Sequence, residues 1–276
     1  KLALKELAGR FFLREISPLT LQEFAELYFE KSLDNFELYE SKLKMVFDEY
    51  LRKPFPEIVK WNDAHKINEY IRELVIEKVM KSDISGIFEN VNISLISTLT
   101  EIFLKDVGMI LNLTALANEL GVHKLTLLKY IEYLEFSKLI RIIKNYRPSI
   151  RAESRKLKKV YPYNIGLSFC FYPELSNGQI YENLVVGALS LNKYWRKNEK
   201  EVDFLKIDDR IIPIEVKAKE KIDQTDLKNI LLFMIKYNLQ KGYVVYNGKE
   251  DVIKINGKII NLLPILKLLF EFKIPA

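Results

Sequence analysis

Short apolar runs with alternating polar positions, typical of β-strands, fill the last third of the chain. The clearest is "EVDFLKIDDRIIPIEVKAK" (201–219), in which two apolar runs flank a charged turn at 208–210. The pattern around this hairpin predicts a helix over 178–191, an aromatic strand "KYWRK", a helix starting near Asp223 or Thr225, a strand "GYVVYN", a hairpin at Asn256-Gly257 and a final helix. This order predicts a small α/β domain.

Helical spacing dominates the first half of the chain. In "SPLTLQEFAELYF", we expect Ser17 to be the N-cap and Pro18 the first helical residue. In "INEYIRELVIEKVM", apolar positions 67, 71, 74, 75 and 79 predict one buried stripe. Residues 111–140 predict a helix, a turn at Gly121 and a second helix, followed by two strands around the basic loop "RPSIRAESRKL". A helix-turn-helix followed by a β-hairpin indicates a winged helix.

Composition narrows the class of protein. The 276 residues are 49% hydrophobic and 29% charged, as in a globular protein of one large or several small domains. No apolar run reaches the ~18 residues that a membrane span needs, so we expect no membrane association. Cys170 is the only cysteine, which excludes an internal disulfide and suits the cytoplasm. Its apolar neighbours predict a buried, unreactive thiol.

Positive charge is concentrated rather than spread. The net charge is +6, yet residues 124–159 hold eleven basic and three acidic side chains. Such a block is typical of proteins that contact phosphate backbones, although a solvated lysine-rich surface explains it equally well. The winged-helix interpretation makes DNA the expected partner, with contacts from the second helix and the wing by Lys124, Thr126, Lys129, Arg147, Arg151 and Arg155. Winged helices also serve as protein-binding modules, so that alternative stays open.

Three charges interrupt the apolar runs of the hairpin. With the hairpin centred on residue 209, Asp203 opposes Glu215, and Lys217 lies on the same face. The other face then carries Val202, Phe204, Ile212, Ile214 and Val216 as a layer against the core. Opposed Cβ atoms are about 4.5–5.5 Å apart, so two carboxylates there repel unless a positive group lies between them.

A divalent cation suits that position. Mg²⁺ or Mn²⁺ prefers carboxylate oxygens, so Asp203 and Glu215 are the candidate metal ligands. Lys217 could act on a water or on a phosphate, and Glu182, on the preceding helix, could assist. The alternative is a purely structural set of salt bridges, Glu215–Lys217 and Asp203–Arg196, on a sheet facing solvent.

Glu182, Asp203 and the run Glu215-Val216-Lys217 resemble the motif of the PD-(D/E)XK nuclease superfamily, and the helical glutamate is similar to the Holliday-junction resolvase branch. The resemblance covers roughly residues 178–248. It implies a restriction-endonuclease-like α/β fold and a metal-dependent DNA nuclease, or that fold without activity.

The chain as a whole resembles the C-terminal portion of a family of archaeal and bacterial AAA-type ATPases with a winged helix and a nuclease-like domain. The segments that carry the likeness are "LAGRFFLREISPLTLQEF" (7–24), "PFPEIV" (54–59), "VYPYNIGL" (160–167), "IYENLVVGAL" (180–189) and "YWR…EVDFL…IPIEVK" (194–217). No G-x-x-x-x-G-K-[ST] loop occurs, so this chain has no nucleotide-binding residues to assign, and ATP belongs only to a longer parent protein. Asn164 replaces the family's usual aspartate, and Arg10 has no assignable role without the rest of the ATPase.

The sequence therefore predicts an α+β and α/β multidomain protein: a helical remnant of the ATPase lid (1–62), a helical and winged-helix domain (63–160) and a PD-(D/E)XK-like domain (161–276). Because the chain begins with Lys1 rather than methionine, we expect it to be part of a longer protein. Its expected function is DNA binding, with metal-dependent endonuclease activity as an open question. Alternatives are a non-catalytic, nucleotide-regulated DNA- or protein-binding module and a winged-helix transcription regulator; oligomers are compatible with all three.

Overall fold

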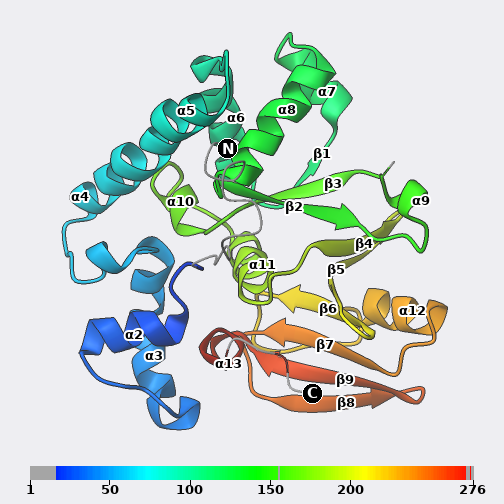
Figure 1. Cartoon of the computed structure of the whole chain (residues 1–276). Helices are drawn as coiled ribbons and strands as arrows, with labels where there is room; N and C mark the ends of the chain where they lie inside the picture. Colours follow the sequence, from blue (N-terminus) through cyan, green and yellow to red (C-terminus); the bar gives the residue numbers. More distant parts are fainter. Residues whose placement is uncertain (1–16, 155, 272–273, 275–276) are drawn as a thin grey trace, which may run out of the picture.

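The computed structural model describes residues 17–154, 156–271 and 274 (Figure 1). Arg10, Arg155 and the first part of the 7–24 segment lie outside them. The helical elements are α2 (Leu21–Phe29), α3 (Phe36–Arg52), η1 (Pro56–Ile58), α4 (Ala64–Glu69), η2 (Tyr70–Glu77), η3 (Val79–Ile84), α5 (Ser85–Ile87), α6 (Ile93–Lys105), α7 (Leu113–Glu119), α8 (Lys124–Phe136), α9 (Ile150–Ser154), α10 (Gly166–Phe169), α11 (Asn177–Ala188), α12 (Lys228–Lys236) and α13 (Ile265–Glu271).

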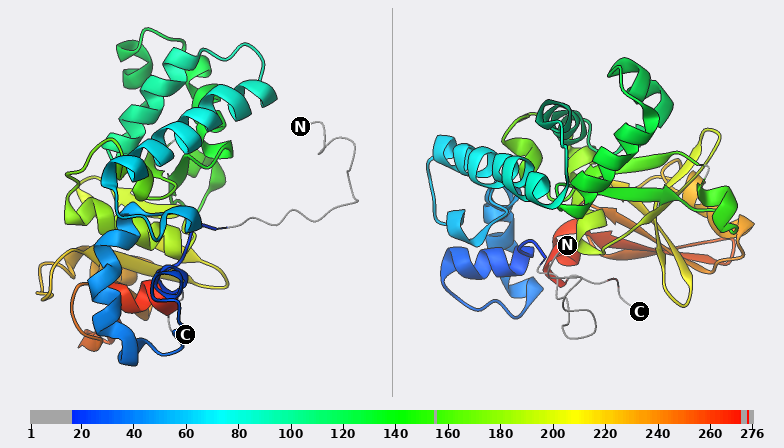
Figure 2. Two further views of the ribbon diagram at one scale, coloured as in Figure 1. Left: turned by 90° about the vertical axis from the view of Figure 1, so that its left-hand side faces the viewer. Right: turned by 45° about the horizontal axis from the view of Figure 1, so that its top comes forward.

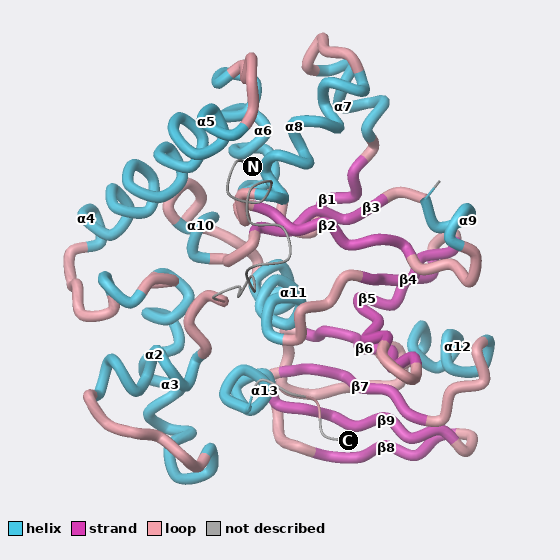
Figure 3. Tube along the Cα trace, in the orientation of Figure 1, coloured by secondary structure: helices cyan, strands magenta, loops and turns pink. Residues whose placement is uncertain are grey.

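Strands from both halves of the chain form one mixed sheet (Figure 3). In chain order they are β1 (Met109–Leu111), β2 (Ile140–Asn145), β3 (Lys158–Pro162), β4 (Lys193–Lys197), β5 (Lys200–Ile207), β6 (Ile211–Lys217), β7 (Lys241–Tyr246), β8 (Asp251–Ile255) and β9 (Lys258–Pro264). Among the described residues the nine strands lie in the order β1-β3-β2-β4-β5-β6-β7-β9-β8. The sheet therefore continues across the predicted domain boundary at residue 160.

The seam between the two halves is a short parallel pairing of β2 with β4. Lys144 pairs with Lys193 and Asn145 with Tyr194. The buried amide of Asn145 extends the pairing: its Nδ2 donates to the carbonyl of Arg196 at 3.1 Å, and its Oδ1 accepts from the Arg196 N–H at 3.1 Å. One side chain thus satisfies both backbone groups of a residue on the neighbouring strand.

Helices cover both faces of the C-terminal sheet. One core joins α11 and α13 to α2 and α3, through residues such as Phe24, Leu184, Ile214 and Leu269. On the other face, α12 packs through Ile230 and Met234 on β7 and β9 and through Phe233 on β4 and β5. The side view in Figure 2 shows α2 and α3 beside the sheet. The predicted lid remnant therefore shares the hydrophobic core of the C-terminal region.

The predicted C-terminal elements are present in the predicted order, but α12 begins at Lys228, after a turn, and not near Asp223 or Thr225. Hairpin β5–β6 has the predicted register, with Phe204 opposite Ile214 and Ile207 opposite Ile211. Asn256 and Gly257 connect β8 to β9 with φ values of 50° and 71°, as a tight hairpin turn requires. Cys170 is buried and its Sγ donates to the carbonyl of Leu167, and burial raises the thiol pKa to about 12, as expected of an unreactive thiol.

The predicted start of α2 is wrong. Its N-cap is Thr20 and not Ser17, and the helix begins at Leu21. The Thr20 hydroxyl accepts from the Glu23 N–H at 3.1 Å, and the Glu23 carboxylate accepts from the Thr20 N–H at 2.8 Å. This reciprocal capping box satisfies two backbone donors, which a cap at Ser17 would not.

The predicted buried stripe over residues 67–79 is also partly wrong. Elements η2 and η3 are π-helical, so each turn holds more residues than an α-helical turn. The side chains buried along this helix are Ile67, Ile71, Ile76, Met80 and Ile84. Leu74, expected in the stripe, is 62% exposed, and Val75 and Val79 are only half-buried.

Residues 109–162 form a short strand, two helices joined by a turn, and the antiparallel pair β2–β3. Gly121 ends the first helix with a φ of 63°. The basic loop between β2 and β3 contains the short helix α9 beside β2 (Figure 1). Among the described residues no helix is long and apolar enough to span a bilayer.

The π-helical register can be tested with two neighbouring side chains. Ile76→Ala should lower the free energy of unfolding by about 2–5 kcal/mol, because it opens a cavity in the core. Leu74→Ala, on the exposed side, should change it by no more than about 0.5 kcal/mol. Urea denaturation followed by circular dichroism measures both. An α-helical register would instead make Leu74→Ala costly.

Candidate functional site

Asp203 stands where the sheet changes its pairing. Between the pairs Lys193–Leu205 and Trp195–Val202, strand β5 holds one residue more than β4, so Asp203 and Phe204 together oppose Tyr194. Such a bulge re-aims side chains. Regular pairing of β5 with β6 also stops at Phe204, and the Asp203 carboxylate accepts from the Val216 N–H at 2.8 Å instead. Asp203 is thereby fixed at the edge of the β5–β6 hairpin.

The bulge corrects one sequence expectation. Val202 was expected on the same face as Phe204, but Val202 packs with Trp195 and Phe233 while Phe204 joins the core on the opposite face. The extra residue in β5 causes this, because it interrupts the alternation of side chains between the two faces. Ile214 and Val216 do lie in the core with Phe204, and Ile212 packs against it.

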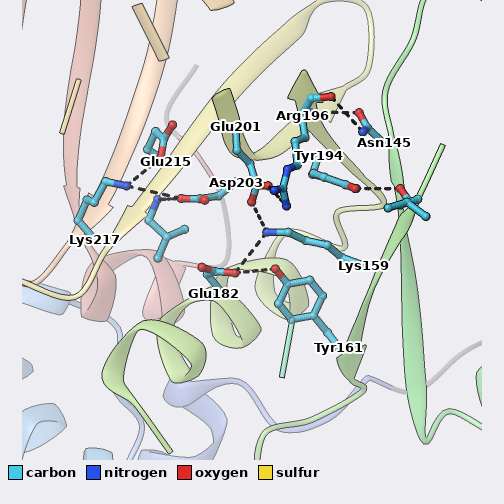
Figure 4. Close-up of polar contacts among 12 residues, drawn as sticks. Asn145, Lys159, Tyr161, Glu182, Tyr194, Arg196, Glu201, Asp203, Glu215 and Lys217 are labelled. Atoms are coloured by element: carbon cyan, nitrogen blue, oxygen red, sulfur yellow. Dashed lines mark hydrogen bonds and ion pairs between the residues drawn. The ribbon is translucent and has the colours of Figure 1, made fainter. Parts of the chain in front are cut away.

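Asp203, Glu215 and Lys217 come together as predicted. Lys217 Nζ lies 2.9 Å from Glu215 Oε2 and 4.0 Å from Asp203 Oδ2 (Figure 4). The Glu215 side chain is 3% exposed, the Asp203 side chain 14% and the Lys217 side chain 27%. The Lys217 side chain thus lies between two largely buried carboxylates and solvent.

Burial governs the protonation of this group. Desolvation, followed by the charge of Asp203, raises the pKa of Glu215 well above its usual value. Desolvation works to lower the pKa of Lys217, but the Asp203 and Glu215 carboxylates outweigh it, so that pKa lies above its usual value. Lys217 is therefore a fixed cation at neutral pH. Glu215 Oε1 is buried and has no hydrogen-bond partner in the described part of the chain.

A second charged group lies on the other side of Asp203 (Figure 4). Lys159 Nζ lies 2.5 Å from Glu201 Oε1 and 3.8 Å from Glu182 Oε2. The hydroxyl of Tyr161 donates to Glu182 Oε2 at 2.6 Å. Lys159 and Tyr161 come from β3, Glu182 from α11 and Glu201 from β5, so the two halves of the chain both contribute.

Asp203 couples the two groups electrostatically. Desolvation and then the charge of Asp203 raise the pKa of Glu182, although Lys159 opposes the shift. Burial works against the charge of Lys159, yet Glu182, Glu201 and Asp203 together hold its pKa above the usual value. A nearby lysine therefore stabilises the negative charge of these carboxylates, and more than one carboxylate stabilises the positive charge of each lysine.

Sequence reasoning missed Lys159, Tyr161 and Glu201. Lys159 was counted in the surface basic block, but it is 5% exposed. Strand alternation could have indicated this, since Lys158 and Lys159 must point to opposite faces. Of the two salt bridges in the structural alternative, Glu215–Lys217 forms and Asp203–Arg196 does not, because Arg196 Nη1 lies 3.6 Å from Glu201 Oε2 instead.

The predicted metal ligands remain a prediction. Among the described residues, no three His, Cys, Asp or Glu side chains are grouped so as to hold a metal ion. The donor chemistry nevertheless suits a hard cation, because Mg²⁺ is often held by one or two carboxylates and otherwise by waters and substrate phosphates. The unpartnered Oε1 of Glu215, next to Asp203, is the observation that favours this fit.

The predicted DNA contacts lie in two places. Lys124, Thr126 and Lys129 are exposed on α8, where Lys124 donates to the Thr114 hydroxyl at 3.2 Å and Lys129 lies over the Tyr133 ring. Leu125, between the first two, is 77% exposed. Arg151 is exposed on α9, and Arg155 lies outside the described residues.

Arg147 is half-buried at the seam. Its guanidinium donates to the Asn145 side chain and to the carbonyls of Tyr146 and Arg196, at 2.6–2.9 Å. These bonds hold the segment after β2 against β4. The side chain expected in a projecting wing thus also joins the two halves of the sheet.

Two family models match the chain. Residues 46–173 match a domain of unknown function, DUF8612, and residues 177–268 match another, DUF4143. DUF4143 is often found at the C-terminus of AAA-type ATPase proteins, which agrees with the coarser part of the resemblance stated from the sequence. Searches among curated proteins and among solved structures found no match.

The raised pKa of Glu215 predicts a pH-dependent stability. A carboxyl whose pKa is higher in the folded than in the unfolded state binds its proton more tightly when folded. The free energy of unfolding should therefore fall as pH rises from the usual value of 4.5 through the folded pKa. Glu215→Gln should reduce this slope by at most about 1.4 kcal/mol per pH unit.

Urea denaturation in a chelating buffer at several pH values measures the slope. Glu199→Gln, which changes an exposed glutamate near the β4–β5 turn, is the matched control and should leave it unchanged. Equal slopes in wild type and Glu215→Gln would contradict the assignment.

Removing Lys159 should be costly. Lys159→Met leaves the half-buried Glu182 without a nearby cation and leaves Glu201 only its loose contact with Arg196, so we expect a loss of about 1–3 kcal/mol in the free energy of unfolding. Lys158→Met, its half-buried neighbour on β3, should cost far less. Chemical denaturation compares the two, and similar losses would show that the charge network does not stabilise the fold.

Proposed function

We propose that this chain is the DNA-binding C-terminal portion of an AAA-type ATPase and that Asp203, Glu215 and Lys217 form a metal-dependent phosphodiester-cleaving site. The observation that carries the proposal is the convergence of two buried carboxylates and one lysine on the β5–β6 hairpin. The β-bulge and the Val216 N–H hold Asp203 in place for that arrangement.

The finer fold assignments belong to the same proposal. The order strand, helix, turn, helix and hairpin over residues 109–162 supports a winged helix. The order α11-β4-β5-β6-α12-β7 supports a PD-(D/E)XK-like fold, with the acidic residues on the central hairpin and Glu182 on the preceding helix. The DUF4143 match supports the link to an ATPase in a longer parent protein.

Each side chain has a definite chemical part in this proposal. Asp203 and Glu215 are the residues that would hold Mg²⁺ or Mn²⁺. The ion would supply Lewis-acid activation of a phosphodiester. Lys217 stays protonated at neutral pH because both carboxylates stabilise its charge, so it acts as a cation toward a phosphate oxygen rather than as a general base. Tyr161 and Lys159 orient Glu182, which assists from the side of α11.

A second candidate is a non-catalytic DNA- or protein-binding module. The observation that favours it is internal neutralisation: Lys217 pairs with Glu215, and Lys159 with Glu201. In this interpretation the two lysines permanently take the role of the cation. A regulator of transcription based on α8 is a further prediction, which would require sequence-specific protection of DNA.

Nicking of supercoiled DNA in Mg²⁺ or Mn²⁺ tests the proposal. Wild type should convert the plasmid to open circles, and Asp203→Asn and Lys217→Met should each lower the rate by about 100-fold or more, because each removes electrostatic stabilisation of the reacting phosphate. Asp209→Asn, at the exposed turn of the same hairpin, should cleave like wild type.

Titration calorimetry with Mg²⁺ separates the two candidates. The nuclease proposal expects metal binding in wild type and its loss in Asp203→Asn. DNA binding with a steep salt dependence but no heat from the metal would favour the non-catalytic module. Equal nicking by wild type and Asp203→Asn, or none by either, would refute the catalytic proposal.

A further inference from the structure

A cleft of about 690 Å³ lies at the seam of the sheet, beside the second charged group. It opens between the end of β2, the segment before β3 and the end of β4. Its lining includes Arg147, Lys156, Tyr194, Arg196 and Lys197. Only Arg147 among them was a candidate for DNA contact from the sequence.

The charge of this cleft is one-sided. Four of the lining residues are arginine or lysine, and none of them is acidic. Of the ion pairs found in the described part of the chain, none involves Arg147, Lys156 or Lys197. Arg196 has a loose contact with Glu201 at 3.6 Å, and its side chain is 38% exposed. Glu153 of the adjacent α9 is occupied by Lys193. The cleft therefore has an unneutralised positive potential.

The basic groups are held in two different ways. Arg147 is fixed by hydrogen bonds to neutral acceptors, which orient the guanidinium without cancelling its charge. Lys156 and Lys197 are exposed at the rim. A guanidinium held in place, with exposed lysine ammonium groups beside it, suits phosphate oxygens, which accept hydrogen bonds from both kinds of side chain.

The surroundings indicate a nucleic-acid backbone rather than a free nucleotide. The Tyr194 ring is fully buried, so the cleft offers no exposed aromatic face on which a base could stack. Arg196 contacts Glu201, Glu201 contacts Lys159, and Lys159 contacts Glu182 (Figure 4). A continuous line of ion pairs therefore connects the edge of the cleft to the acidic side chains around Asp203. A strand bound there would pass close to the candidate cleavage site.

We propose that this basic cleft, lined by Arg147, Lys156, Arg196 and Lys197, binds consecutive phosphates of a DNA strand. The proposal rests on the proposed function only in that the bound strand is the substrate of the Asp203 site. Arg196 has a dual position, because it contacts Glu201 and lines the cleft at the same time.

Fluorescence anisotropy with a labelled DNA oligonucleotide in EDTA tests the cleft without cleavage. The double variant Lys156→Glu/Lys197→Glu should weaken binding by about 10-fold or more and reduce the slope of log affinity against log salt by about two. The matched control Lys228→Glu/Lys254→Glu makes the same change of charge on exposed residues of α12 and β8 and should change affinity less than about twofold.

Each outcome has one meaning. Equal weakening by the cleft and control variants would overturn the proposal, because only net charge would then matter. Unchanged binding by the cleft variant would also overturn it, as would tighter binding of poly-glutamate than of DNA by wild type. A wild type that binds DNA through the cleft but never nicks it refutes the nuclease site and leaves the cleft proposal standing.

Discussion

The parallel pairing of β2 with β4 is the contact on which the rest of the molecule depends. It spans few residues, and the Asn145 amide completes it by pairing with both backbone groups of Arg196. Because of this seam, β3 lies near enough to α11 for Tyr161 and Lys159 to reach Glu182. Without it, Glu182 would lack Lys159, Glu201 would keep only its loose contact with Arg196, and the cleft beside them would not exist.

Local signals predicted the order of the C-terminal helices and strands. The hairpin β5–β6 has the register that its turn fixes, and Asn256-Gly257 forms a turn that few other residue pairs allow. The seam could not be predicted, because it pairs residues near 145 with residues near 194 and neither segment carries a local signal for that pairing. The π-helical stretch was not predicted for another reason. Its apolar residues do not repeat at the spacing of an α-helix, but an α-helix was assumed because it is far more common.

The residues of the candidate site also differ in whether local sequence signals could predict them. Asp203, Glu215 and Lys217 are neighbours in one hairpin, so the arithmetic of strand pairing was enough to bring them together. Lys159, Tyr161 and Glu201 reach the site through contacts between distant segments and through a bulge that no local rule locates. Counting charges along the sequence also placed Lys159 wrongly on the surface, because such a count treats every lysine as solvated. Lys159 is almost completely buried.

A continuous sheet has a mechanical consequence. The helices over residues 113–136 and the hairpin that bears Asp203 are attached to one sheet, unlike domains that are joined by a flexible linker. A DNA strand bound by α8 would therefore reach Asp203 at a fixed distance, which the sheet sets. Lengthening β4 or inserting residues at the seam would change that spacing while leaving each surface intact.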